Sequence, residues 1–323
     1  MDRYHTEDLS LYLLLPPASR SDRMIFPSDA KILSYECSAP VRFFYLLISC
    51  LVVLSAQAGA PPSRVVSINL CSDQLLLMLA KPEQIASISR LSLEPNSSFM
   101  AASAARYPVN DAMIEQLLGF NPDLVLASEF SPHPVIRILR HLGYRVETLP
   151  LSSTLEDIRR NIRFTAALLH TEEKGERLVA EMDRRLEIVA SNSTQARPSA
   201  LFYQPRGYTS GLETLQHEAL LLAGWRNLSA EHGIRGYGAI DLETLLLAKP
   251  QQLFSSAYAP GTDSLAQRQM HHPALNLITR GRPIINVPYK YWICGGPMIA
   301  NAVELLAKAR PDAAPHTTGK NSE

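Results

Sequence analysis

One segment of this sequence occurs twice. Residues 114–128 (IEQLLGFNPDLVLAS) align without gaps on residues 242–256 (LETLLLAKPQQLFSS), at the constant offset that separates Glu115 from Glu243. Each copy predicts a helix that ends at a Pro and is followed by a strand. Helix–Pro–strand units are common in α/β proteins, so chance explains part of the match. The shared Glu, Leu-Leu, Pro and Ser in one register favour duplication, and the chain is expected to contain two similar lobes.

Short apolar and β-branched runs alternate with helical patterns in both halves of the chain. In the first half, strands are expected at residues 64–68, 85–89, 123–127 and 145–149, and helices at 73–80 and 134–142. In the second half, strands are expected at 200–203, 252–255 and 283–287, and helices up to Leu222 and over 301–309. Strands that alternate with helices imply parallel sheets covered by helices on both faces.

A long helix is expected between the two halves. Ser153 and Glu156 have the spacing of a capping box for a helix that runs towards Leu169. Thr171 then has the character of an N-cap, and a helix over 171–192 would span about 30 Å. This helix is expected to join lobes at 64–170 and 197–310, with a disordered tail at 311–323. The alternative is one more surface helix of a single α/β domain.

The N-terminal region has the features of an export signal. Residues 43–54 are apolar, Arg42 precedes them, and the small-residue site Ala56–Ala58 follows, as in a secretory signal peptide. Cleavage is expected after Ala58, and residues 1–58, longer than a signal needs, are assigned to the signal region. A buried helix or a single anchor is the alternative, and Cys50 lies in a lipobox-like segment. After cleavage two cysteines remain, Cys71 and Cys294, as buried small hydrophobes or as one disulfide.

The bulk composition excludes several classes of protein. The formal net charge is zero and 19% of the residues are charged, so nothing indicates a nucleic-acid partner. The histidines are scattered, without HExxH or CxxC spacing, and His133, His217 and His232 do not form a recognisable ligand set. The GYTSG segment places Ser210 out of register with a hydrolase nucleophile elbow. A divalent metal-ion binding protein and an exported α/β hydrolase are therefore kept only as alternatives.

Several segments together carry a family resemblance. They are RVVSINL (64–70), NPDLVLA (121–127), LRHLGYRV (139–146), GYGAIDLE (236–243), Lys249-Pro250, and HPAL (272–275) leading to Tyr291-Trp292. This pattern resembles the class III periplasmic binding proteins of ABC importers for iron-siderophores, haem and vitamin B12. The resemblance implies an α/β fold of two Rossmann-like lobes with central parallel sheets, joined by one long α-helix, with a ligand cleft between them.

The resemblance also implies a function in transport. The chain would be a periplasmic monomer, with no enzymatic activity and no intrinsic cofactor. It would capture a ferric siderophore, cobalamin or haem. It would deliver the ligand to the membrane-subunit dimer of the importer, and Glu115 and Glu243 resemble the pair of carboxylates that dock on that dimer. The alternative is that each Glu only supports the N-terminus of its helix.

Candidate ligand contacts follow from the rule that ligands of open α/β sheets lie beyond the carboxyl ends of the strands. They are Asn69, Cys71, Arg90 and Phe130 in the first lobe, and Arg206, Tyr208, Arg235, Tyr237, Tyr258, Tyr291 and Trp292 in the second. Rings with polar tips suit a large and partly apolar ligand, and guanidinium groups suit its carboxylates. The alternative is that these aromatics pack the loops.

Two features of these loops leave open the identity of the ligand and the bonding state of the cysteines. Tyr237 stands where the similar vitamin B12-binding protein carries a Trp, and the matching position in the first copy is Val109, which weakens a direct extension to cobalamin. Cys71 and Cys294 are expected in loops of different lobes, as a cross-lobe disulfide, as free thiols facing the ligand, or as buried packing.

Overall fold

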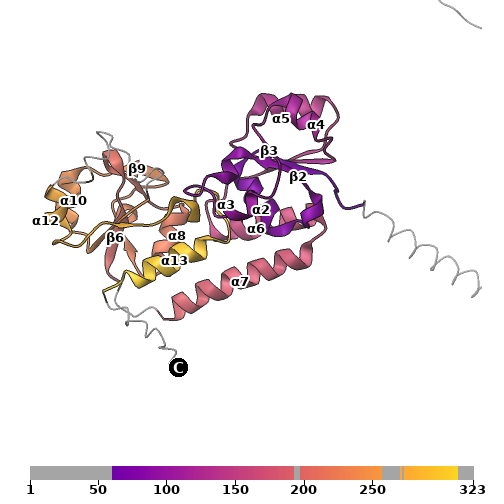
Figure 1. The fold of residues 1–323 in the computed structure, drawn as a ribbon. Helices are drawn as coiled ribbons and strands as arrows, with labels where there is room; N and C mark the ends of the chain where they lie inside the picture. Colours follow the sequence, from indigo (N-terminus) through magenta and orange to yellow (C-terminus); the bar gives the residue numbers. More distant parts are fainter. Residues whose placement is uncertain (1–59, 193–196, 257–269, 271–272, 312–323) are drawn as a thin grey trace, which may run out of the picture. The chain divides into compact units, whose positions relative to one another are not determined.

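Two parallel β-sheets, one from each half of the chain, organise the fold (Figure 1). The computed structural model describes residues 60–192, 197–256, 270 and 273–311, and the chain from Ala60 onward forms one unit. The expected signal region, Tyr258 and all but the first residue of the expected tail lie outside the described residues.

The first sheet has five parallel strands in the order β3-β2-β1-β4-β5. The strands are β1 (Val65–Ser67), β2 (Ile85–Ser89), β3 (Val109–Asn110), β4 (Leu124–Ser128) and β5 (Val146–Leu149). All except β3 fall on segments that the sequence predicts as strands. β4 is buried along its whole length, as expected for a central strand with both faces covered.

Helices cover both faces of the first sheet. They are α2 (Leu70–Leu79), α3 (Ala101–Ala104), α4 (Ile114–Gly119), α5 (His133–His141) and α6 (Leu155–Leu169). On one face, Leu117 of α4 and Leu139 of α5 pack with Val125. On the other, Leu76 of α2 and Ile162 of α6 belong to a larger core cluster.

The second sheet has four parallel strands in the order β11-β10-β6-β8. They are β6 (Ser199–Phe202), β8 (Arg226–Asn227), β10 (Gln252–Ser255) and β11 (Ile285–Asn286), and the helices of this half are α8 (Leu215–Leu222), α9 (Leu228–Glu231), α10 (Leu242–Ala248), α12 (Pro273–Ile278) and α13 (Ile299–Lys308). Trp225 lies fully buried here, donates its indole N–H to the carbonyl of Leu306 at 2.8 Å and meets Phe254 edge-on.

A small antiparallel pair of strands was not expected from the sequence. β7 (Tyr208–Ser210) pairs with β9 (Tyr237–Ala239) outside both parallel sheets. The similarity between the two copies of the repeated segment does not extend to this pair of strands. The helix and strand of the repeat are confirmed as α4–β4 and α10–β10, but Val109 lies in a parallel edge strand of the first sheet, whereas Tyr237 lies in the antiparallel pair.

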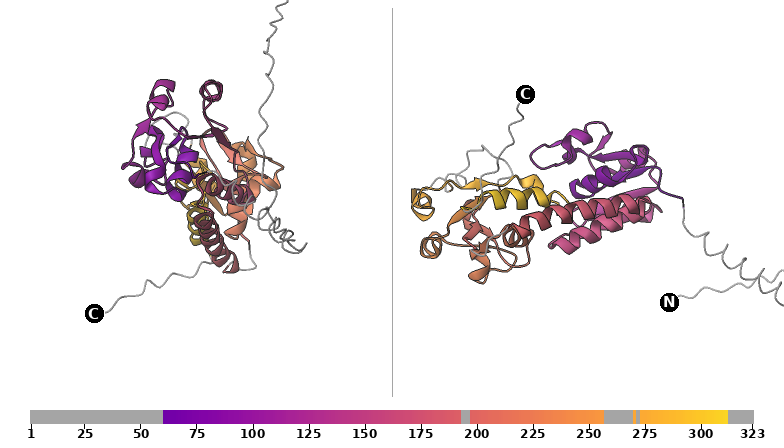
Figure 2. Two further views of the ribbon diagram at one scale, coloured as in Figure 1. Left: turned by 90° about the vertical axis from the view of Figure 1, so that its right-hand side faces the viewer. Right: turned by 90° about the horizontal axis from the view of Figure 1, so that it is seen from below.

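The predicted long helix is confirmed as α7 (Glu172–Ser191). It contacts α6 of the first half and both α8 and α13 of the second, and it lies alongside α6 and α13 in Figures 1 and 2. Val179, Met182 and Leu186 of α7 belong to a core cluster that contains residues of both halves, including Ile162 and Phe202. None of the described helices combines the length and the apolar character that crossing a membrane requires.

The capping box before this helical pair lies one residue later than predicted. Thr154, not Ser153, caps α6: its hydroxyl accepts the N–H of Asp157 at 3.1 Å, and the Asp157 carboxylate accepts the N–H of Thr154 at 3.0 Å. The three-residue spacing of the motif is as predicted. The predicted pair, Ser153 and Glu156, was wrong by one residue, and Asp157 takes the part expected of the Glu. Thr171 is the N-cap residue of α7, although its hydroxyl makes no capping hydrogen bond there.

The close approach of α6 and α7 depends on Gly175. A Cβ at this position would lie 2.6 Å from the Cβ of Ala166, so Gly175→Ala forces the two helices apart. We expect the free energy of unfolding in urea to fall by about 1–3 kcal/mol. Gly119→Ala is the matched control, because a Cβ there meets nothing within 4 Å, and it should leave stability unchanged or slightly raised. Equal stabilities of the two variants would contradict the tight helix packing.

Candidate functional site

A small hollow lies where the carboxyl ends of the first sheet meet the second half of the chain. Its lining comprises Cys71 and Leu75 of α2, residues 128–130 after β4, residues 149–152 after β5, Asn161 of α6, and residues 293–295 from the second half. Its volume of about 20 Å³ has room for about one water molecule. A bulky ligand would therefore lie over the hollow rather than inside it.

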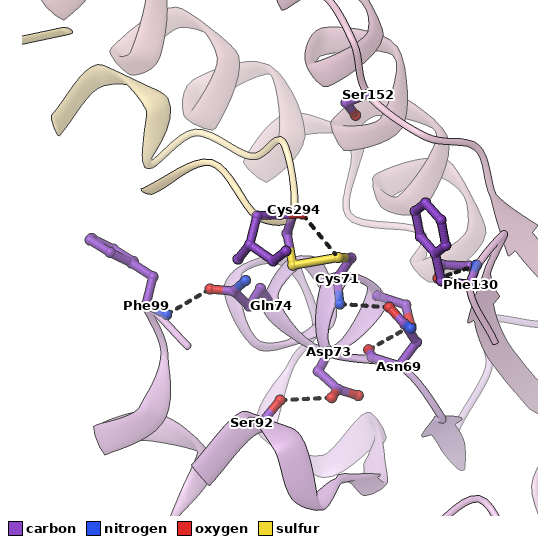
Figure 3. The surroundings of a disulfide bond; sticks show 12 residues. Asn69, Cys71, Asp73, Gln74, Ser92, Phe99, Phe130, Ser152 and Cys294 are labelled. Carbon is purple, nitrogen blue, oxygen red and sulfur yellow. Dashed lines mark hydrogen bonds between the residues drawn. A yellow bond between two sulfur atoms is a disulfide. The ribbon is translucent and has the colours of Figure 1, made fainter. Parts of the chain in front are cut away.

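A disulfide between Cys71 and Cys294 forms one wall of the hollow (Figure 3). The Cα atoms lie 4.8 Å apart, and the residues are separated by 223 positions in the sequence. Of the three states left open by the sequence, the structure has the cross-lobe disulfide, in place of free thiols or buried packing. Cys71 therefore presents a disulfide sulfur to the site.

The N-terminus of α2 holds Cys71 in place. Asn69 caps the helix, with its side-chain oxygen accepting the N–H of Cys71 at 2.9 Å. One turn further in, the fully buried Asp73 accepts hydrogen bonds from the N–H of Ser89 at 3.1 Å, the hydroxyl of Ser89, and the hydroxyl of Ser92 at 2.7 Å. Figure 3 shows Asn69, Cys71 and Asp73 on successive parts of this turn. The carboxylate thus ties α2 to the loop that follows β2.

Burial dominates the electrostatics of this carboxylate. It raises the pKa of Asp73 from 3.8 to about 6, although the hydrogen bonds from Ser89 and Ser92 act in the opposite direction. A charged group without a cation is costly in a buried site, and protonation relieves that cost. Asp73 therefore titrates close to neutral pH, within one turn of the disulfide.

Three exposed aromatic side chains are among the predicted ligand contacts. Phe130, 70% exposed, borders the hollow. Tyr208 and Tyr237, 56% and 66% exposed, lie together on the β7–β9 pair, and the hydroxyl of Tyr237 donates to Gln216 at 3.2 Å. These two tyrosines are not among the residues that line the hollow.

The predicted arginines Arg90, Arg206 and Arg235 are all exposed. Arg90 holds Asp111 through two hydrogen bonds of 2.6 and 3.0 Å, and Arg235 pairs with Glu213. Arg206 lies in a left-handed backbone conformation with φ of 64°. Exposed ion pairs are weak, so a ligand carboxylate could replace Asp111 or Glu213.

Two further predicted contacts support the loop that carries Cys294. Trp292 is only 4% exposed, donates its indole N–H to the hydroxyl of Ser256 at 2.8 Å, and packs edge-on against Phe202. The ring of Tyr291 lies 6.2 Å from the ring of Phe99 in the first half. Both rings therefore have packing partners within the protein.

Several residues of the hollow were not predicted. Residues 150–152 follow β5, and the strand-end rule applied to that strand would have found them. Asn161 gave no signal because it lies within a helix. Its amide N–H groups donate to the carbonyl of Pro150 at 2.8 Å and to the hydroxyl of Ser152 at 2.9 Å, while its buried side-chain oxygen has no partner among the described residues.

The two matched glutamates lie at equivalent and exposed positions. Glu115 is the second residue of α4 and Glu243 is the second residue of α10.

In the described part of the chain, no group of three or more His, Cys, Asp or Glu side chains could hold a metal ion, so the divalent-metal alternative finds no ligand set there. His217, for example, lies beside Asn227 at 3.3 Å.

Comparison with known proteins identifies the family. The sequence pattern described as periplasmic binding protein matches residues 65–281, about two thirds of the chain. The chain belongs to the periplasmic binding protein family. This family assignment agrees with the resemblance carried by the sequence motifs and with the two parallel sheets.

The relatives of this periplasmic binding protein are distant. A cobalamin-binding protein of Halobacterium salinarum is 23% identical over 64% of this chain, and the match spans 57% of that relative's length. A vitamin B12-binding protein of Vibrio campbellii is 23% identical over 68% of this chain and 80% of its own. The solved structure of the periplasmic haem-binding protein RhuT from Roseiflexus sp. RS-1, without ligand, is 22% identical, with a TM-score of 0.63 over 76% of this chain and 96% of that one. That similarity shows a shared fold.

The raised pKa of Asp73 predicts that stability depends on pH. The folded chain binds this proton more tightly than the unfolded chain does, so the stabilising contribution is complete below about pH 4 and is lost as pH rises through about 6. The rise in the pKa of Asp73 corresponds to a change of at most about 3 kcal/mol in the free energy of unfolding. In urea unfolding between about pH 4.5 and pH 7.5, wild type should lose stability as pH rises, and Asp73→Asn should remove this component.

An exposed carboxyl provides the control for that measurement. A hydrogen bond from Arg90 holds the pKa of Asp111 below its usual value, so Asp111→Asn should retain the decline between pH 4.5 and 7.5. An unchanged pH profile in Asp73→Asn would show that the buried carboxyl does not cause it.

Proposed function

We propose that this protein is the substrate-binding component of an ABC importer and that it captures a bulky metal chelate or corrinoid. One observation carries the proposal: loops at the carboxyl ends of the first sheet and a loop following the second converge on one hollow. Ligands of open α/β sheets bind at such edges. The helix α7 contacts α6 of the first half and both α8 and α13 of the second, and so links the two halves that carry the site.

The side chains around the hollow suit a large ligand with apolar faces and polar edges. Phe130 and Leu151 border the hollow with exposed apolar surface, and Asn161 lines it with a side-chain oxygen that has no partner among the described residues. Arg90, which does not line the hollow, carries an exposed guanidinium in an ion pair with Asp111. Cobalamin, haem and ferric siderophores all combine such features. The names of the two curated relatives favour cobalamin, and that of the solved structure favours haem.

Delivery would use the two matched glutamates. Among the described residues, neither carboxylate forms an ion pair or a side-chain hydrogen bond, and both are exposed at the start of short helices that belong to a repeated unit. A membrane-subunit dimer with two-fold symmetry offers two equivalent sites for such a pair.

In this proposal residues 1–58 direct export, cleavage follows Ala58, and the mature chain acts as a periplasmic monomer without an intrinsic cofactor or catalytic role.

Ligand binding should raise the thermal stability of the mature protein. A ligand at 100 times its Kd adds about 2.7 kcal/mol to the folded state, which raises Tm by about 5–10 °C for a chain of this size. Cyanocobalamin, haemin and a ferric hydroxamate are tested separately by differential scanning fluorimetry. Phe130→Ala should reduce the shift of the active ligand, whereas Phe164→Ala, an exposed Phe of α6 outside the hollow, should retain it. No shift with any of the three would contradict the proposed ligand class.

Charge reversal at the matched glutamates should separate docking from ligand binding. Glu115→Lys with Glu243→Lys should weaken binding to the detergent-solubilised importer about tenfold or more, because charge pairs steer and orient docking. Ligand Kd should stay within about twofold, since neither residue lines the hollow. Glu83→Lys with Glu187→Lys is the charge-matched control on other exposed positions. Loss of ligand binding with intact docking would assign the two glutamates a different role.

A further inference from the structure

The Cys71–Cys294 disulfide joins two separately anchored supports. On the first side, Cys71 is the second residue of α2, which Asn69 caps and Asp73 ties to the loop after β2. On the second side, Trp292 anchors the loop through its hydrogen bond to Ser256 and its contact with Phe202. The covalent bond therefore connects the framework of one lobe to the core of the other, and does not join two loose loops.

Two further contacts place the lobes against each other at the disulfide. Phe99 and Tyr291 form an edge-to-face ring pair with centroids 6.2 Å apart. Gly295 has φ of 51°, and a Cβ there would lie 2.5 Å from the Cβ of Ser152, so the loop passes close to the strand-end loop of the first sheet. The disulfide is the covalent element among these contacts.

Both cysteines are partly exposed and line the same hollow as Phe130 and Leu151. Thiol–disulfide exchange needs access of a thiolate to one of the sulfur atoms. Because both cysteines are partly exposed, a reductant would approach the bond from the surface over the hollow, and a ligand lying over Phe130 would block that approach. The same surface therefore serves ligand binding and reduction of the bond.

We infer that the Cys71–Cys294 bond is a redox-responsive lock on the ligand site, open to a dithiol reductant when the site is empty and shielded when it is filled. The inference rests on the proposed function for the identity of the ligand site. The oxidised bond holds the floor of the site in one arrangement, and ligand affinity is highest in that state. By linkage, a ligand that prefers the oxidised protein also stabilises the bond against reduction.

The dithiol reductant supplies the electrons and protons that the exchange reaction needs. A thiolate of the dithiol attacks one sulfur, the Cys71–Cys294 bond breaks, and the departing cysteine thiolate takes up a proton. The second thiol of the reductant then attacks the mixed disulfide, which releases the other cysteine as a thiol and leaves the reductant as its own disulfide. The protein gains two electrons and two protons, and the dithiol loses them.

Hydrogen exchange on the ligand-free mature protein tests the lock itself. Wild type is compared as oxidised protein and after reduction with dithiothreitol, together with the Cys71→Ser/Cys294→Ser and Cys71→Ala/Cys294→Ala double variants. We expect amide exchange in residues 71–75 and 289–296 to rise about tenfold or more in all three forms without the bond, because these segments open locally once they are not joined. Exchange in α5 serves as the internal control and should not change. Equal exchange with and without the bond would overturn the inference.

Ligand measurements test the coupling. With cyanocobalamin, haemin and the ferric hydroxamate as probes, we expect Kd to rise about fivefold or more when the bond is absent. By linkage, saturating probe should shift the equilibrium of the bond with a dithiothreitol redox buffer towards the oxidised protein by the same factor. Equal Kd values in both redox states would overturn the coupling. If none of the three probes binds the oxidised protein, the proposed ligand class fails, while the exchange data still decide whether the bond locks the two segments.

Discussion

The structure depends on the geometry of parallel strands. Because all strands of each main sheet run in the same direction, their carboxyl ends lie along one edge, and every loop that leaves that edge is available to a ligand. Asn69, Phe130 and Ser152 follow three different strands of the first sheet, yet they lie in one neighbourhood (Figure 3). Sequence distance therefore has little bearing on membership of the site.

A shared core supports this arrangement. The main hydrophobic cluster contains residues of both halves, and α7 contributes Val179, Met182 and Leu186 to it. Ion pairs such as Arg159–Asp183 and Arg185–Glu304 fasten α7 to α6 and to α13. Such partly exposed pairs add little energy individually, so apolar packing along α7 accounts for most of the coupling between the halves.

The sequence predicted the parts of the fold whose signal is local. All seven expected strands have counterparts, in β1, β2, β4, β5, β6, β10 and β11, because apolar runs and turn residues mark them directly. No apolar run marks β3, β8 or the β7–β9 pair, whereas the equally short β1 and β11 lie within longer apolar runs. Trp292 shows the corresponding limit for the site: its type suited a ligand contact, but only the partners Ser256 and Phe202 reveal that it packs inside. The state of Cys71 likewise depended on a residue 223 positions away.

That distant pairing also changes the topology of the polypeptide. The bond between Cys71 and Cys294 closes a covalent ring that contains the long helix α7 and most of both sheets. A protease that cuts the backbone once inside this ring releases no fragment, since the two pieces stay joined through sulfur. A chain exposed to proteolysis would thus keep its two pieces covalently joined after a first nick, and only reduction would break that link.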